Sequence, residues 1–153
     1  MEDQGKKLTF FQKTPIQCPL CETVFYREEL LTGGGRMIAG PLTRDLRRMY
    51  EPSKKFGEVY PLIYPITVCP ACFYATLPQD FTSPPEKNKG ILLEQSEKRK
   101  ESLKPLFPEL DFTRPRRLQE GTASYILAVY CYDYFTKEYS PTIKQGICCL
   151  RAA

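Results

Sequence analysis

The apolar residues of this chain follow a strand-like spacing in the first half and a helical spacing toward the end. Residues 8–11 and 23–26 are short apolar runs on either side of a cysteine-containing turn, which predicts two strands. Residues 58–76 carry the clearest strand signal, because the side chains from Leu62 to Val68 are apolar at every second position. This segment leads into a second cysteine-containing turn. The pattern therefore predicts a small β unit built around two turns.

Helical periodicity begins near Arg116. The positions that share one predicted face are Ala123, Ile126, Leu127, Tyr130, Cys131 and Tyr134. A second helix is expected to start at Pro141, because Ser140 is a suitable N-cap residue and proline is favoured at the first helical position. The short connection predicts that the two helices pack as an antiparallel hairpin. No capping residue stops the second helix, so we expect further helices or a partner to complete it.

Two weaker helical signals lie between these regions. Thr43 is placed to cap a short helix that ends near Tyr50. Residues 91–104 also permit a helix, but their apolar positions cluster at the start, so this segment should bury little and act as a spacer or lid. A proline-rich joint at 78–90 precedes it. The predicted domains are a ribbon (1–80) with an insert (27–57), a linker with the spacer helix (81–115) and a helical hairpin (116–153).

The two cysteine-containing turns share the pattern Cys-Pro-x-Cys. The first turn has two residues between Cys18 and Cys21, and the second turn has two residues between Cys69 and Cys72. Four thiolates from two such turns are the usual tetrahedral ligands of a structural zinc ion. The spacing therefore predicts a zinc ribbon.

Three other uses of these cysteines fit the sequence less well. Disulfides need an oxidising compartment, whereas the chain shows neither a signal-like opening nor a membrane-length apolar run, so we expect a reduced, cytoplasmic protein. A thioredoxin-type site would have one such motif at the start of a helix. Iron is the rival metal because rubredoxin uses the same ligands. However, Glu22 and Phe73 stand where rubredoxin turns normally carry glycine, which favours zinc.

Composition narrows the range of activities. The chain has 153 residues, a net charge of +4 and no histidine. Ser-His and Cys-His catalysis and HExxH metalloprotease sites are therefore excluded within this chain. Cys131, Cys148 and Cys149 lie on or beside apolar helix faces, where a free cysteine usually acts as a small hydrophobic residue. We expect a protein that is not an enzyme.

The insert holds the most basic segment. Its six basic residues stand against two acidic ones, Asp45 and Glu51. The basic residues are Arg36, Arg44, Arg47, Arg48, Lys54 and Lys55. Together with Tyr50 and Phe56 they are candidates for a surface that binds nucleic acid or an acidic protein. The favoured alternative is a solvated face in which Asp45 pairs with an arginine.

The order of these segments resembles a bacterial family of uncharacterised proteins that carries a domain-of-unknown-function label. The resemblance rests on the two CPxC turns and on the segments LTRDLRRMYEPSKKFG, YPLIYPITVCPACFYA and RRLQEGTASYILAVYCYDYF. It implies zinc knuckles followed by helices similar to tetratricopeptide repeats, in proteins that usually continue beyond the end of this chain. Glu22 and Phe73 stand where glycine is common in relatives. This departure bears on the geometry of the turns and not on their ability to bind a metal. The metal ligands implied by the resemblance are Cys18, Cys21, Cys69 and Cys72.

The sequence as a whole predicts an α+β protein, with a small rubredoxin-like zinc ribbon followed by an α-helical hairpin that resembles a tetratricopeptide-type repeat. The favoured function is a non-enzymatic zinc-binding scaffold or adaptor that binds another protein through the helical surface around Tyr130 and Tyr134. The alternatives are a nucleic-acid-binding ribbon that uses the basic insert and a rubredoxin-like iron electron carrier. The sequence determines neither the partner nor the oligomeric state.

Overall fold

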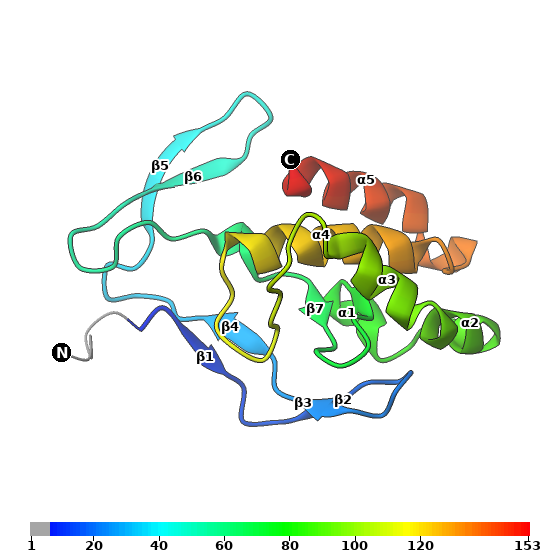
Figure 1. The fold of residues 1–153 in the computed structure, drawn as a ribbon. Helices are drawn as coiled ribbons and strands as arrows, with labels where there is room; N and C mark the ends of the chain where they lie inside the picture. The colour runs from blue at the N-terminus through cyan, green and yellow to red at the C-terminus, as the bar shows by residue number, and fades with distance from the viewer. Residues whose placement is uncertain (1–6) are drawn as a thin grey trace.

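The computed structural model describes residues 7–153, in which small antiparallel sheets are combined with helices, as the predicted α+β class requires (Figure 1). The strands are β1 (Thr9–Phe11), β2 (Ile16–Gln17), β3 (Val24–Phe25), β4 (Glu28–Leu30), β5 (Ile38–Leu42), β6 (Arg48–Glu51), β7 (Thr67–Val68) and β8 (Ala75–Thr76). The α-helices are α1 (Pro78–Phe81), α2 (Lys89–Glu94), α3 (Ser96–Leu103), α4 (Leu118–Tyr132) and α5 (Pro141–Ala152). Short 3-10 helices are η1 (Pro61–Ile63), η2 (Glu86–Asn88) and η3 (Lys137–Tyr139).

The first half of the β unit is one long, interrupted hairpin. β1 pairs with β4 and β2 pairs with β3, both antiparallel, so that the first cysteine turn lies at the tip. Between the two ladders the N–H of Gln12 donates to the carbonyl oxygen of Arg27 at 2.8 Å. The strands predicted around residues 8–11 and 23–26 are confirmed.

The long strand predicted before the second turn is wrong. Only β7 is extended there, and η1 occupies residues 61–63. The backbone carbonyls of this segment bond to side chains rather than to a neighbouring strand: Tyr125 donates its hydroxyl to Leu62, and Arg116 donates to Ile63 at 3.0 Å and to Ile66 at 2.7 Å. Two prolines, Pro61 and Pro65, also remove donors from any ladder.

The helix predicted from Thr43 is wrong as well, because β5 and β6 form an antiparallel hairpin in this part of the insert. The Thr43 hydroxyl, expected to cap a helix, accepts a hydrogen bond from the N–H of Arg47 at 3.0 Å and so closes the hairpin turn. Leu46 adopts a left-handed backbone conformation in that turn, with φ of 62°. Figure 1 shows the hairpin beside the C-terminal end of α5, and Arg48 of β6 lines one pocket together with Tyr125 of α4 and Arg151 of α5.

The two C-terminal helices, α4 and α5, are confirmed, and α5 runs back along α4 (Figure 1). The predicted cap differs in detail. Ser140 has a left-handed backbone, with φ of 50°, and its side chain makes no capping hydrogen bond. The helix is instead held to the molecule by Lys144, which lies 2.6 Å from Asp80, and by Gln145, whose amide donates to the carbonyl oxygen of Val129 at 2.9 Å.

The segment expected to bury little contributes to the core. Helices α2 and α3 bury Leu92, Arg99 and Leu103. The buried apolar cluster is continuous from the cysteine turns through these helices to α4. The proposed division at residues 81–115 stays a prediction about which parts fold by themselves.

Within the described part of the chain, none of the helices combines the length and the apolar character that a membrane crossing would require.

Candidate metal centre

Each cysteine turn lies at the tip of a two-stranded hairpin, and the two tips have the same backbone hydrogen bonds. The first cysteine of each turn donates its backbone N–H to the carbonyl oxygen of the residue five positions later, at 2.9 Å in both cases. Its carbonyl oxygen accepts the N–H of the residue four positions later, at 3.0 Å in both cases. The flanking strands, β2 with β3 and β7 with β8, pair at equivalent registers. The two turns are therefore structural repeats of one another.

The residue after each second cysteine has a left-handed backbone. φ is 64° at Glu22 and 58° at Phe73. A residue with a Cβ atom loses about 1–2 kcal/mol in this conformation, which explains why glycine is common there. Both turns nevertheless close with the same hydrogen bonds, so the two departures from glycine leave the geometry of the turns intact.

The four turn cysteines bring their sulfur atoms to one place. All four Sγ atoms lie within 4.8 Å of one another. Cys18 Sγ is 3.7 Å from Cys72 Sγ, and Cys21 Sγ is 3.5 Å from Cys69 Sγ. A tetrahedral ion with metal–sulfur bonds of about 2.3 Å has sulfur–sulfur edges of about 3.8 Å. The donor atoms and their spacing therefore fit a single metal ion.

Burial and crowding govern the protonation of these thiols. Contact with the thiols of Cys18 and Cys72 lowers the pKa of Cys69 to about 2, whereas contact with Cys18 and Cys69, together with burial, raises the pKa of Cys72. Contact with Cys69 and burial also raise the pKa of Cys18 to about 12. Adjacent thiolates repel one another, so the cluster by itself retains protons. A divalent cation reverses this, because it stabilises every coordinating thiolate.

A buried arginine that no sequence pattern singles out adjoins the second turn. Arg99 on α3 is 4% exposed. Its Nη2 donates to the carbonyl oxygen of Cys72 at 3.0 Å, and its Nη1 donates to that of Leu92 at 2.6 Å. In the sequence Arg99 stands between Lys98 and Lys100 in a polar run, so no local signal distinguishes it from a solvated residue.

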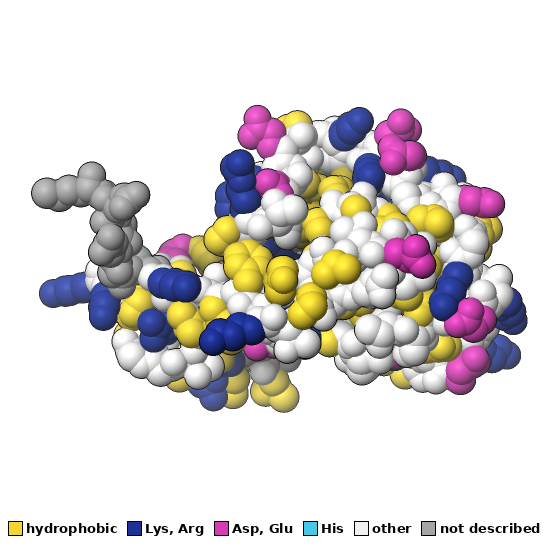
Figure 2. Space-filling model, turned by 90° about the horizontal axis from the view of Figure 1, so that it is seen from below, with side chains coloured by type: hydrophobic (Ala, Val, Ile, Leu, Met, Phe, Trp, Pro, Cys, Tyr) yellow, Lys and Arg dark blue, Asp and Glu magenta, His cyan; other side chains and the backbone are white. Residues whose placement is uncertain are grey.

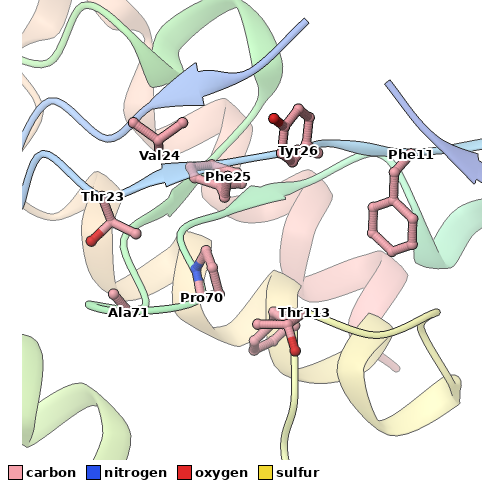
Figure 3. Close-up of a pocket in the computed structure, with 9 residues that line it drawn as sticks. Phe11, Thr23, Val24, Phe25, Tyr26, Pro70, Ala71 and Thr113 are labelled. Carbon is pink, nitrogen blue, oxygen red and sulfur yellow. The ribbon is translucent and has the colours of Figure 1, made fainter. Parts of the chain in front are cut away.

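An apolar groove of about 490 Å³ lies beside the two turns (Figure 3). Phe11, Val24 and Tyr26 of the first hairpin line it, facing Pro70 and Ala71 of the second turn. Figure 2 shows hydrophobic side chains gathered on the face of the molecule seen from below.

The six basic residues predicted as a surface do not form one uniform group. Arg36 and Lys55 lie over the ring of Phe56, at 4.9 Å and 5.2 Å from its centroid, and Phe56 is buried rather than available for stacking. The side chains of the other four are exposed along or beside the hairpin. These are Arg44, Arg47, Arg48 and Lys54.

The ion pair expected for Asp45 is not formed among residues 7–153. Asp45 instead accepts a hydrogen bond from the hydroxyl of Thr43, which lowers the pKa of the Asp45 carboxyl. The arginines of the hairpin are thus left without a carboxylate partner in the described part of the chain.

Tyr130 and Tyr134 lie together beside a pocket of about 310 Å³ between α3 and α4. Tyr130 is 37% exposed, whereas Tyr134 is half-buried against the core. Arg99 also lines this pocket.

Three cysteines lie outside the cluster of four. Cys131 and Cys148 are buried, and Cys149 is exposed.

Comparison with known proteins places the chain among bacterial relatives. The profile of a family described as "Uncharacterized protein conserved in bacteria (DUF2225)" matches residues 10–153. A protein of Borreliella burgdorferi called "Uncharacterized protein" is 46% identical over 149 residues, which cover 97% of this chain and 53% of the relative. The chain thus spans about half the length of the curated relative that it matches. No solved structure matches the chain.

Proposed function

This chain belongs to the bacterial DUF2225 family, and we propose that it is a zinc-binding scaffold in which Cys18, Cys21, Cys69 and Cys72 hold one structural ion. The observation that carries the proposal is the convergence of four sulfur atoms within 4.8 Å from two turns with the same backbone hydrogen bonds. Zinc is preferred because four thiolates in tetrahedral arrangement are its usual structural site. With all four positions filled by the protein, such an ion has no open position for a substrate, so the proposed role is non-enzymatic.

The ion would provide stability that the β unit lacks. The hairpins that carry the turns have strands of two residues on each side of each turn, and two-stranded hairpins are marginal in water. Structural zinc sites in small domains contribute about 10–16 kcal/mol of apparent binding free energy at neutral pH. The metal would therefore hold the two hairpins together and against the helices.

The scaffold role further requires a surface for a protein partner, which we assign to the helices. Ile143, Ile147 and Leu150 lie at helical spacing on α5 and are all exposed. Tyr130 adds an exposed aromatic ring on α4. Large exposed apolar side chains grouped on one helix face, as on α5, are typical of protein contacts. Replacing Ile147 or Tyr130 with aspartate should abolish binding of such a partner while leaving zinc content unchanged.

Elemental analysis of the purified protein, with a visible absorption spectrum, tests the metal assignment. We expect one zinc per chain, lost in Cys18→Ser and in Cys69→Ser. Cys149→Ser is the matched control, because Cys149 is exposed and outside the cluster. If the protein instead contains iron and absorbs visible light, a rubredoxin-like electron carrier would be favoured over the scaffold. A folded protein that binds neither metal would contradict the proposal.

A nucleic-acid-binding role is a second candidate, favoured by one observation. The hairpin of β5 and β6 exposes Arg47 and Arg48 without an ion-pair partner among the described residues.

The salt dependence of binding to single-stranded RNA tests this candidate. Affinity should fall steeply as salt is raised, and Arg47→Gln/Arg48→Gln should reduce the slope by about two. Lys98→Gln/Lys104→Gln is the control, since it removes the same charge from exposed positions on α3 and directly after its last residue. Absence of binding at low salt would eliminate this role.

A further inference from the structure

Arg99 is a buried cation without a buried anion beside it. Its side chain is 4% exposed, and among residues 7–153 no carboxylate lies within 4.0 Å of its guanidinium. All its hydrogen-bond acceptors are neutral: the carbonyl oxygens of Cys72 and Leu92, and the hydroxyl of Ser96 at 3.4 Å. Its Nε atom has no partner within the described residues. Burial of a charge is costly unless a charge of opposite sign compensates it.

The guanidinium lies against the backbone of the second cysteine turn. Nη2 lies 3.0 Å from the carbonyl oxygen of Cys72, whose sulfur is one of the four that converge. Burial raises the pKa of Cys131, a thiol that neighbours the second turn, and the charge of Arg99 opposes this rise. The positive charge therefore lies against the backbone of one of the four candidate ligands.

A comparison with Arg116 shows what is unusual about this arrangement. Arg116 also donates from its guanidinium to two backbone carbonyls, those of Ile63 and Ile66. In that case burial lowers the pKa of Arg116, and the charge of the buried Glu28, whose carboxylate accepts the backbone N–H of Arg116 at 3.0 Å without an ion pair to the guanidinium, opposes this effect. Arg99 has the same kind of hydrogen bonds without such a carboxylate.

We propose that Arg99 balances the negative charge of the metal-loaded cysteine centre and thereby raises its affinity for a divalent metal. A divalent ion with four thiolates has a net charge of about −2, which Arg99 reduces by one unit. The inference rests on the proposed metal site and adds to it a residue outside the ligand set. Arg99 is a positioning residue: it acts through the thiolates and donates to the backbone of one ligand without coordinating the ion itself.

Zinc affinity, measured by competition with a chromophoric chelator at fixed pH, tests the proposal on the full chain. Arg99→Gln removes the charge but keeps a hydrogen-bond donor, and it should weaken zinc binding about 10–100-fold, the usual effect of losing a group that supports metal ligands. Arg99→Lys keeps the charge and should bind zinc within a few-fold of the wild type. Lys98→Gln is the matched control, because it removes one exposed charge from the same helix and should leave the affinity unchanged.

The outcomes separate this inference from the function on which it rests. If the wild type binds zinc and Arg99→Gln binds it with equal affinity, the role proposed for Arg99 is wrong, whereas the metal site is still supported. Equal losses in Arg99→Gln and Arg99→Lys would overturn charge balance in favour of the guanidinium hydrogen bonds. Wild type that binds no divalent metal would overturn both. If Arg99→Gln does not fold, Arg99→Lys still decides, because a loss of 10-fold or more in a charge-preserving variant would contradict the proposal.

Discussion

At the scale of single residues, the two cysteine turns place their sulfur atoms at distances that suit a metal ion, but each turn holds one residue in an unfavourable left-handed backbone conformation. Glu22 and Phe73 both accept a left-handed conformation, but they differ in what their side chains do. Glu22 is exposed. The ring of Phe73 instead packs edge-to-face on Phe112 at 5.3 Å, and Lys100 lies 5.7 Å from its centroid. The backbone cost is therefore compensated by packing only at Phe73.

Glu22→Gly should raise the free energy of unfolding by about 0.5–1 kcal/mol, because relief of the left-handed strain exceeds the entropy cost of glycine. Phe73→Gly should lower it, because the loss of ring burial outweighs the same relief. Urea unfolding of the metal-loaded protein measures both. Glu22→Ala is the control and should give no gain; an equal gain with alanine would show that strain is not the cause.

The reactivity of the thiols should report the metal centre directly. Cys149 is exposed, whereas burial raises the pKa of Cys131 and that of Cys148, the latter to about 11, so both remain protonated thiols at neutral pH. Alkylation of the native protein should therefore modify Cys149 first, and removal of the metal by a chelator should add the four cluster cysteines. Mass spectrometry counts the modified residues. Full alkylation of the cluster before chelation would argue against a bound ion.

At the scale of elements, a polar cluster attaches α5 to the rest of the protein. The Tyr132 hydroxyl donates to Asp80 at 2.7 Å and accepts the N–H of Leu77 at 3.1 Å. Lys144 of α5 reaches the same carboxylate oxygen at 2.6 Å. Three helices, α1, α4 and α5, thus meet at Asp80.

Tyr132→Phe should lower the free energy of unfolding by about 1–3 kcal/mol, because it leaves the buried Asp80 and the Leu77 N–H each without one partner. Chemical denaturation followed by far-ultraviolet circular dichroism measures the change. Tyr130→Phe is the matched control on the same helix, since that side chain is 37% exposed, and it should change stability by less than about 0.5 kcal/mol. Equal effects of the two variants would contradict the role of the cluster.

Two helical glycines offer a second matched pair. A Cβ atom at Gly121 of α4 would lie 2.3 Å from the Cβ atom of Ile63, whereas one at Gly146 of α5 would meet nothing within 4 Å. Gly121→Ala should therefore cost about 1–3 kcal/mol by overpacking, and Gly146→Ala should gain up to about 1 kcal/mol from helix propensity. Thermal denaturation of both variants checks the opposite signs. A neutral Gly121→Ala would mean that α4 and η1 are not in close contact.

At the scale of the whole molecule, the cysteine turns and the helices share one core. Cys18, Cys69 and Cys72 belong to the same buried cluster as Tyr125 and Leu127 of α4. The N–H of Ala75, just after the second turn, also lies 3.5 Å from the sulfur of Cys131 on α4. Loosening of the turns should therefore be transmitted to the helices.

We accordingly expect metal removal to lower the melting temperature of the helices and the β unit together, in one cooperative transition. Far-ultraviolet circular dichroism follows the helices, and the near-ultraviolet signal of the tyrosines follows the packed core, before and after chelation. Two separate transitions, with only the near-ultraviolet signal sensitive to metal, would favour the predicted division into a ribbon and an independent helical hairpin.

The sequence by itself determined the features that depend on local pattern. The two cysteine turns, and with them the four candidate ligands, follow from the CPxC spacing, and the positions of α4 and α5 follow from apolar periodicity and from Pro141. The strands around the first turn were also predictable, because the turn fixes their pairing.

The tertiary structure alone decided the features that depend on contacts distant in sequence. Residues 61–66 alternate like a strand, yet Tyr125 and Arg116, more than 50 positions away, bind their carbonyls and replace the ladder. The hairpin in the insert overrides a helical pattern, because the side chain of Thr43 closes a turn instead of starting a helix. Arg99 resembles its solvated neighbours in the sequence and becomes a buried cation only when α3 packs on the second turn. Periodicity and capping describe interactions within a few residues, whereas burial and long-range hydrogen bonds arise only once the chain is folded.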